Sequence, residues 1–141
     1  MVAFLLITHG SLGKSLQECA EHVMGGPLER FSVLSVDRSA DPEIMREQAA
    51  QQIAALASED GVLVLSDIYG ATPCNIATRL PGARVALVSG VSLPMLIRAL
   101  TYRKLSLTEV VAKAVSGGRD GIVVVEAAPE TADCKNEAAH A

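Results

Sequence analysis

The sequence predicts an α/β domain, a single open sandwich in which a mainly parallel sheet carries helices on both faces. Short runs rich in aliphatic and β-branched residues alternate with longer amphipathic stretches. The short runs lack polar alternation, which favours parallel strands buried on both faces. The predicted strands are Val2 to Thr8, Phe31 to Val36, Val62 to Ser66, Arg84 to Ser89 and Ile122 to Val125.

The first two predicted helices have clear start signals. The small residues from Gly10 to Ser15 open the first helix directly after the first strand. Asp41 and Pro42 suit the N-cap and the first helical position of the second. The predicted buried stripe of this second helix is Ile44, Ala49, Ile53 and Leu56.

Two more helices are predicted after the fourth strand. Leu93 to Ile97 begins one of them, with Pro94 in its first turn. Ser106 and Glu109 have the spacing of a capping box at the start of the other. The pair Gly117-Gly118 is predicted to end it.

Length and composition indicate one domain with an apolar core. The chain has 141 residues, of which 50% are hydrophobic, and its net charge is −4. Such a chain can bury a core without disulfides or metal. Because no Lys/Arg cluster exceeds the pair Arg103-Lys104, nucleic acid is not expected as a partner. From about Glu126 the composition turns polar, so we expect a folded domain over 1–126 and a disordered tail over 127–141.

The sequence also indicates a cytoplasmic protein. Cys19, Cys74 and Cys134 are odd in number and lack metal-type spacing, which suits a reducing cytosol. The longest apolar runs fall far short of the roughly 20 residues that cross a bilayer. Any membrane role is therefore expected to come through a partner.

Three of the predicted strands end in loops that suit chemistry. These loops are His9 to Ser11, Asp67 to Pro73 and Gly90 to Pro94. The carboxyl ends of parallel strands share one edge of a sheet, where ligands bind. A carboxylate at Asp67 can accept a proton from one nitrogen of His9 and leave the other nitrogen nucleophilic.

Hydroxyl groups and glycines would complete an anion site. Thr72 and Ser92 offer hydroxyl donors, while Gly70 and Gly90 allow close approach of the backbone. Simpler interpretations stay open, because a strand-end histidine is often a partly buried structural residue and Asp67 can cap its own turn. The remaining candidates are interpreted as structural, with His22 and His140 on the surface, Cys74 as a buried thiol, and Pro73 and Pro94 as helix starters.

At these loops the chain resembles the enzyme IIA components of the mannose family of the phosphoenolpyruvate-dependent sugar phosphotransferase system. The resemblance covers nearly all of the predicted folded part. The motifs that carry it are Ile7-Thr8-His9-Gly10, Asp67-Ile68-Tyr69-Gly70-Ala71-Thr72-Pro73-Cys74-Asn75 and Ser89-Gly90-Val91-Ser92-Leu93-Pro94-Met95-Leu96. The chain departs from the family pattern at Ala71 and Thr72, where Gly-Ser is usual, and at Ser92, where Asn is usual.

The resemblance implies a role for each of these residues. His9 would accept a phosphoryl group from the carrier HPr and pass it to an enzyme IIB partner, and Asp67 would orient His9. Gly10, Gly70, Ala71, Thr72 and Ser92 would bind the phosphoryl group. No metal or cofactor is expected, since transfer between histidines depends on positioning and fixed donors.

The resemblance also implies partners. Enzyme IIB would be a separate chain and would feed a sugar permease, so membrane contact would be indirect. A homodimer is implied, with Ile122 to Val125 packed against the partner subunit; antiparallel exchange of this strand is one form of that packing.

Other functions remain open on the sequence. One is a phosphorelay without a transporter, in which the state of His9 regulates other proteins. A second is the phosphocarrier subunit of a dihydroxyacetone kinase, which shares the leading histidine. A third is a small tetrapyrrole-pathway chelatase, whose His-Gly-Ser triplet is similar but whose metal site needs a further ligand. The last is a binding module in which His9 carries no phosphoryl group.

Overall fold

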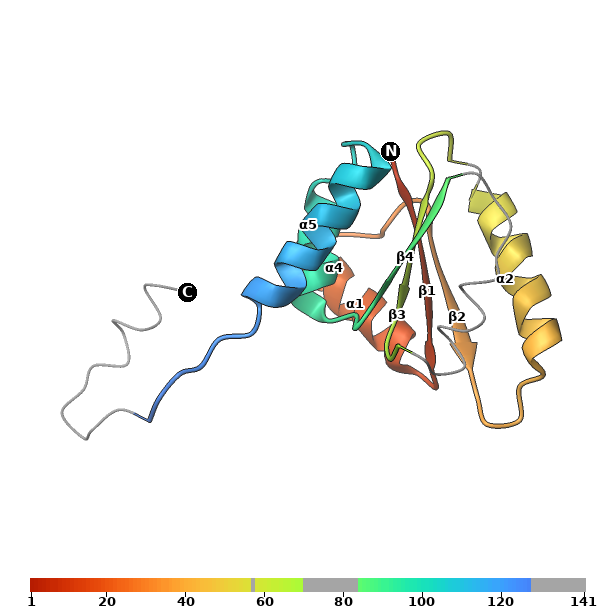
Figure 1. Cartoon of the computed structure of the whole chain (residues 1–141), viewed down its shortest axis with the longest axis horizontal. Coiled ribbons are helices and arrows are strands. Elements are labelled where there is room, and N and C mark those ends of the chain that lie inside the picture. Colours follow the sequence, from red (N-terminus) through yellow and green to blue (C-terminus); the bar gives the residue numbers. More distant parts are fainter. Residues whose placement is uncertain (57, 70–83, 128–141) are drawn as a thin grey trace.

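The computed structural model of the chain describes residues 1–56, 58–69 and 84–127. Strands and helices alternate along it as the sequence predicts (Figure 1). In chain order the elements are β1 (Ala3–His9), α1 (Leu12–Met24), β2 (Phe31–Val36), α2 (Pro42–Leu56), β3 (Val62–Ser66), β4 (Val85–Ser89), α4 (Leu93–Thr101) and α5 (Leu107–Asp120).

The strands form one parallel sheet with the order β2-β1-β3-β4. In the registers, Ile7 pairs with Leu34 on one side and with Ser66 on the other, and Ser66 pairs with Ser89. The chain leaves β1 toward one side and returns to its other side at β3. The carboxyl ends of β1 and β3 therefore flank the switch point where open α/β sheets bind ligands.

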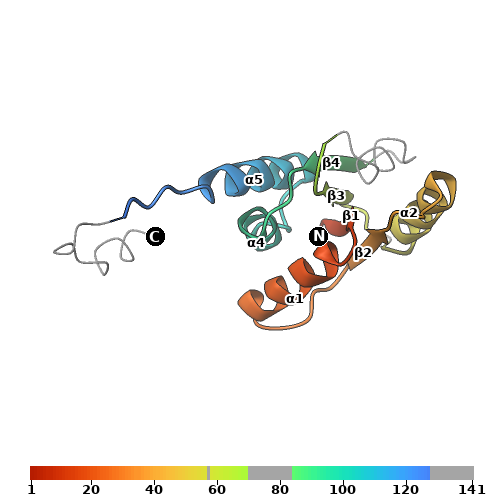
Figure 2. The ribbon, with the colours of Figure 1, turned by 90° about the horizontal axis from the view of Figure 1, so that it is seen from below.

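Helices cover both faces of the sheet, which confirms the predicted fold class. Helices α1, α4 and α5 lie on one face and α2 lies on the other (Figure 2). Side chains of β1 alternate between the two cores, with Phe4 and Leu6 facing the three-helix side and Leu5 and Ile7 facing α2. Because β1 is buried on both faces, its carboxyl end is a rigid support for His9.

The predicted stop at Gly117-Gly118 is wrong, because α5 continues to Asp120. A Cβ built at Gly117 would lie 2.8 Å from Cβ of Arg98 and 3.1 Å from the carbonyl oxygen of Pro94. The glycine allows α4 and α5 to pack closely instead of ending the helix.

Two more expectations are corrected by the structure. Ile122 to Val125 form no strand with any described part of the sheet, and their side chains are 67–85% exposed. The segment runs away from the sheet after α5 (Figure 1) and pairs with none of the described strands. Ile44 is 51% exposed and does not join the buried stripe that Ala49 and Leu56 provide on α2.

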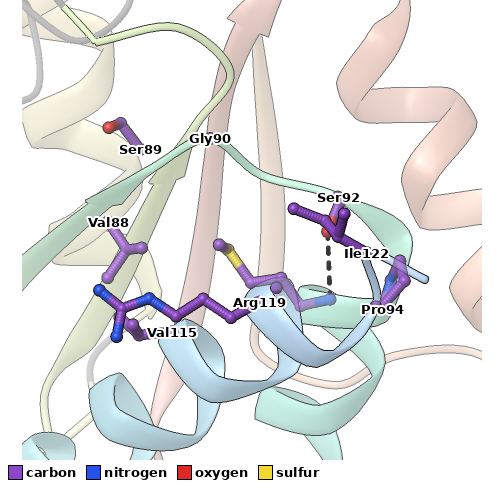
Figure 3. Close-up of a pocket in the computed structure, with 11 residues that line it drawn as sticks. Val88, Ser89, Gly90, Ser92, Pro94, Val115, Arg119 and Ile122 are labelled. Atoms are coloured by element: carbon purple, nitrogen blue, oxygen red, sulfur yellow. Dashed lines mark hydrogen bonds between the residues drawn. The ribbon is translucent and has the colours of Figure 1, made fainter. Parts of the chain in front are cut away.

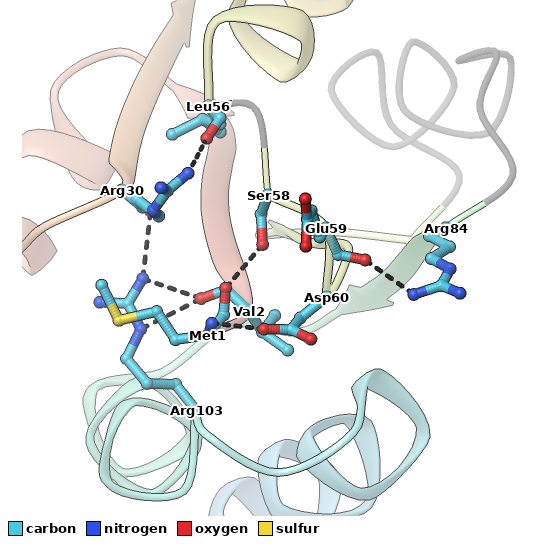
Figure 4. Close-up of polar contacts among 9 residues, drawn as sticks. All are labelled: Met1, Val2, Arg30, Leu56, Ser58, Glu59, Asp60, Arg84 and Arg103. Carbon is cyan, nitrogen blue, oxygen red and sulfur yellow. Dashed lines mark hydrogen bonds and ion pairs between the residues drawn. The ribbon is translucent and has the colours of Figure 1, made fainter.

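A buried arginine, Arg103, connects the amino-terminal ends of the strands, opposite the ends where His9 and Asp67 lie (Figure 4). The guanidinium of Arg103 donates to the carbonyl oxygens of Val2 and Arg30 at 2.8–3.2 Å and stacks over the Phe4 ring. Burial lowers the pKa of Arg103. The terminal ammonium of Met1 pairs with Asp60 beside it. These contacts tie the start of β1 to its neighbours at the end far from His9.

Some predictions concern residues outside the described ranges. They are the tail beyond Ala127, with Cys134 and His140, and the residues Gly70 to Cys74. Of the remaining surface predictions, His22 is exposed, as expected. None of the helices in the described ranges is both long enough and apolar enough to cross a bilayer.

Candidate functional site

The structure brings His9 and Asp67 into direct contact. Asp67 follows β3, and its Oδ2 lies 2.9 Å from Nδ1 of His9. The backbone N–H of His9 donates to the same oxygen at 3.0 Å, and the N–H of Ile68 donates to Oδ1 at 2.9 Å. The carboxylate is thus held from three directions and in turn fixes the imidazole.

The surroundings of Asp67 favour its ionised form. Its side chain is only 9% exposed, and burial by itself would raise the pKa of the carboxyl. The N–H donors of His9 and Ile68 outweigh that burial and hold the pKa of Asp67 below its usual value of 3.8. An ionised carboxylate can only accept hydrogen bonds, so Nδ1 of His9 carries the proton.

In the neutral imidazole, the other nitrogen, Nε2, carries the lone pair. The His9 side chain is 49% exposed, so the ring is accessible from solvent. A neutral imidazole with an oriented Nδ1–H and a free Nε2 is an effective nucleophile.

The turn after His9 is built from glycine and a buried threonine. Gly10 has φ +52°, a left-handed conformation that favours glycine, and its N–H donates to the carbonyl of Val36 at 2.9 Å. Oγ1 of Thr8 accepts from the N–H of Gly13 at 2.8 Å. The backbone N–H groups of Gly10 and Gly13, near the start of α1, therefore bind other parts of the chain. Gly10 has no free N–H to donate to an anion.

Ser92 lines the cavity drawn in Figure 3, and His9 is not among the residues that line it. Its Oγ accepts from the N–H of Met95 at 3.3 Å and caps α4. It lines a space of about 400 Å³ together with Gly90 and Arg119. The structure thus gives Ser92 a capping role and does not bring it into the cavity that His9 lines.

The backbone after β4 lies beside the Asp67 loop. The N–H of Gly90 donates to the carbonyl of Asp67 at 3.1 Å, and that of Val91 donates to Ser66 at 3.0 Å. Gly90 has φ +81°, and a Cβ there would meet nothing within 4 Å. Its backbone conformation, rather than a close approach, is what requires glycine.

The remaining predicted phosphoryl-binding residues, Gly70, Ala71 and Thr72, lie outside the described residues. Within 1–56, 58–69 and 84–127, no three His, Cys, Asp or Glu side chains are grouped closely enough to hold a metal ion.

Two further features of the site lie beside its predicted residues. Exposed apolar side chains, Leu12, Ile68 and Tyr69, lie within three residues of His9 or Asp67. Arg38, just after β2, lines a cavity of about 550 Å³ that His9 also lines. In the sequence, Arg38 can be placed just beyond the carboxyl end of a predicted strand. Its closeness to His9 follows only from the strand order, in which β2 lies next to β1.

Comparison with known proteins identifies relatives along most of the chain. The family described as PTS system fructose IIA component (EIIA-man) matches residues 3–115. The PTS system mannose-specific EIIAB component of Escherichia coli K12 is 32% identical over 132 residues, which cover 91% of this chain and 41% of that protein. The chain thus spans less than half the length of this curated relative.

Two further matches come from Bacillus subtilis and Enterococcus faecalis. The PTS system fructose-specific EIIA component of Bacillus subtilis is 27% identical over 108 residues, covering 74% of this chain and 72% of that protein. The mannose/sorbose specific IIA subunit from Enterococcus faecalis has a similar fold, with a TM-score of 0.80 and 22% identity, covering 92% of this chain and 98% of that one. By the family match over residues 3–115, this chain belongs to the mannose-type IIA family of the phosphotransferase system.

Proposed function

We propose that this protein is a phosphoryl carrier that accepts a phosphoryl group from phospho-HPr on Nε2 of His9 and passes it to an enzyme IIB protein. The observation that carries the proposal is the 2.9 Å contact between His9 and Asp67. This contact keeps the proton on Nδ1 and leaves Nε2 of a half-exposed side chain as the nucleophile, in a chain of the IIA family.

In the proposed transfer, the Nε2 lone pair forms a bond to phosphorus while the bond from phosphorus to the donor nitrogen breaks. The donor imidazole leaves with that electron pair. The His9 ring keeps its Nδ1 proton and becomes positively charged, and the carboxylate of Asp67 balances this charge. Transfer to IIB is the same step in reverse, with IIB supplying the attacking group.

Asp67 therefore acts on both halves of the relay. It lowers the barrier to attack by stabilising the positive ring, and it remains in contact when the ring becomes the leaving group. The positive end of the α1 dipole, beginning at Leu12, adds a modest stabilisation of the phosphoryl anion. Residues Gly70, Ala71 and Thr72 are proposed to complete the phosphoryl pocket, on the resemblance of their loop motif.

Docking is proposed to use the apolar surface beside the nucleophile. The exposed side chains of Leu12, Ile68 and Tyr69 can be covered by a partner, which would exclude water from the transferring group. HPr and IIB would use this surface in turn. A sugar permease would be reached only through IIB.

We further propose a homodimer in which Ile122 to Val125 pack on the partner subunit. This apolar segment is largely exposed in the single chain, and β4 is paired only on its β3 side among the described strands. An added strand would cover both the segment and the free edge of β4.

A pulse and chase tests the carrier role. The protein is labelled from radioactive phosphoenolpyruvate through enzyme I and HPr, separated from the donors, and then mixed with an enzyme IIB protein of the mannose family. We expect the label to leave this protein and to appear on IIB. Label that stays on this protein, while a known IIA protein labels the same IIB, would contradict the proposed relay.

A further inference from the structure

A cavity of about 550 Å³ opens between the ends of β1 and β2. His9 and Gly10 line it from one side, and Asp37, Arg38 and Ala40 line it from the other. Arg38 is thus a cation at the same cavity as the proposed nucleophile.

The sheet register explains how Arg38 comes to this place. Val36, the last residue of β2, is the registered partner of His9 and accepts a hydrogen bond from the N–H of Gly10. Arg38 follows two residues later. Asp37 then closes a tight turn, because its carbonyl accepts from the N–H of Ala40 at 3.3 Å. This turn reverses the chain directly after β2, so Arg38 lies next to the cavity that His9 lines.

The nearby carboxylates already have donors of their own. Oδ1 of Asp37 accepts from both the N–H and the hydroxyl of Ser39 at 2.9 Å. Oδ1 of Asp41 accepts from the N–H of Glu43 at 2.9 Å, at the start of α2. Asp67 is bound by His9 and Ile68.

Arg38, in contrast, is exposed, and its side chain makes no hydrogen bond or ion pair with any part of the chain that the structure describes. A guanidinium presents a rigid fork of donors that matches the oxygens of a phosphoryl group. An unpaired guanidinium at the cavity of a histidine nucleophile is suited to bind the anion that the histidine acquires.

We propose that Arg38 binds the phosphoryl group while it is carried on His9. The inference rests on the proposed function. Arg38 takes no part in bond making or breaking, and it donates hydrogen bonds to the phosphoryl oxygens after transfer. Asp67 then balances the positive charge of the ring, whereas Arg38 balances the negative charge of the phosphoryl group. Together they shift the transfer equilibrium toward the phosphorylated form of this chain.

The test compares Arg38→Gln and Arg38→Lys with the wild-type chain in the transfer equilibrium with phospho-HPr at fixed ionic strength. The equilibrium constant is expected to fall about tenfold in Arg38→Gln, the effect typical of losing a hydrogen bond to a charged group. Arg38→Lys should retain part of the effect because it keeps the charge. In phosphorus NMR, the second ionisation of the phosphoryl group should move to higher pH in Arg38→Gln.

Lys104→Gln is the matched control, since it removes one exposed positive charge beside Arg103, at the far edge of the sheet. It should leave both readouts unchanged. Equal equilibrium constants and NMR titrations in wild type and Arg38→Gln would overturn the inference. A slower transfer at an unchanged equilibrium constant would also overturn it, because Arg38 would then contact the partner protein.

Failure of the wild-type chain to accept any label would be a separate result. It would overturn the proposed function, and the role of Arg38 with it. Normal labelling of wild type with no effect of Arg38→Gln would leave the proposed function intact.

Discussion

Nδ1 of His9 lies 2.9 Å from Oδ2 of Asp67, although 58 positions separate the two residues in the sequence. The parallel pairing of β1 with β3 produces this contact, because Ile7 and Ser66 are registered partners and both strands end at the same edge. Asp67 also binds the backbone N–H of His9, so one carboxylate oxygen fixes both the main chain and the ring.

We expect Asp67→Asn to slow phosphoryl acceptance by His9 about tenfold or more while leaving His9 able to be labelled. The amide keeps the shape of the side chain but loses the charge that stabilises the positive ring, and one charge-assisted hydrogen bond is typically worth such a factor. Rapid-quench labelling from phospho-HPr measures the rate. Asp60→Asn is the control, since Asp60 is also a carboxylate with a lowered pKa but lies at the other edge of the sheet. Equal slowing in both variants would contradict the account.

Asp67 should also make the stability of the fold depend on pH in acid. Its pKa in the folded chain lies below the usual value of 3.8, because the N–H donors of His9 and Ile68 outweigh the opposing effect of burial. The stabilisation is therefore fully present above 3.8 and is lost as the pH falls through the folded pKa. The difference in unfolding free energy between wild type and Asp67→Asn, measured in urea, should shrink over that range. A constant difference would show that Asp67 does not titrate in this way.

Gly117→Ala should destabilise the fold by about 1–3 kcal/mol, the usual cost of overpacking. The added methyl group would meet Cβ of Arg98 at 2.8 Å and the Pro94 carbonyl, neither of which can move without shifting α4. Gly118→Ala is the matched control, because its closest contact is the flexible end of Met95 at 2.9 Å. Urea unfolding should show a clearly larger loss for Gly117→Ala. The reverse order would mean that helix propensity outweighs the packing of α4 on α5.

The proposed dimer predicts that charges in the exposed apolar segment disrupt assembly. Val123→Asp combined with Val124→Asp places one carboxylate on each side of the extended chain, and should convert a dimer into a monomer in sedimentation equilibrium. Ile44→Asp is the control, since Ile44 is an exposed apolar residue on α2. A wild-type chain that sediments as a monomer at every concentration tested would contradict the dimer.

The four strands of the described sheet could be predicted because each is a short apolar run, which is visible in the local sequence without knowledge of the neighbouring strands. The starts of α2, α4 and α5 could also be predicted from nearby residues, since Pro42, Pro94 and Ser106 stand at or next to these starts. The same local reasoning failed at Gly117, where the reason for glycine is contact with Arg98 on another helix.

What could not be predicted depends on the order of the strands and on neighbours distant in sequence. The run from Ile122 to Val125 resembles a strand, but it is exposed and leads away from the described strands, and its local sequence does not indicate this. Ser92 is predicted as an anion donor from its loop, and neither its capping of α4 nor its place at a cavity that His9 does not line is visible in that loop. Arg38 could not be predicted as a site residue, because its importance comes from β2 lying beside β1.

The most direct test of the central claim is the intact mass of the protein after incubation with phosphoenolpyruvate, enzyme I and HPr. His9→Ala is the comparison, and because His9 is half exposed this substitution should leave the fold intact in circular dichroism. We predict one added phosphoryl group, labile in acid, on the wild-type chain and none on folded His9→Ala. Equal labelling of both proteins, or no labelling of the wild type while HPr itself is phosphorylated, would contradict the account.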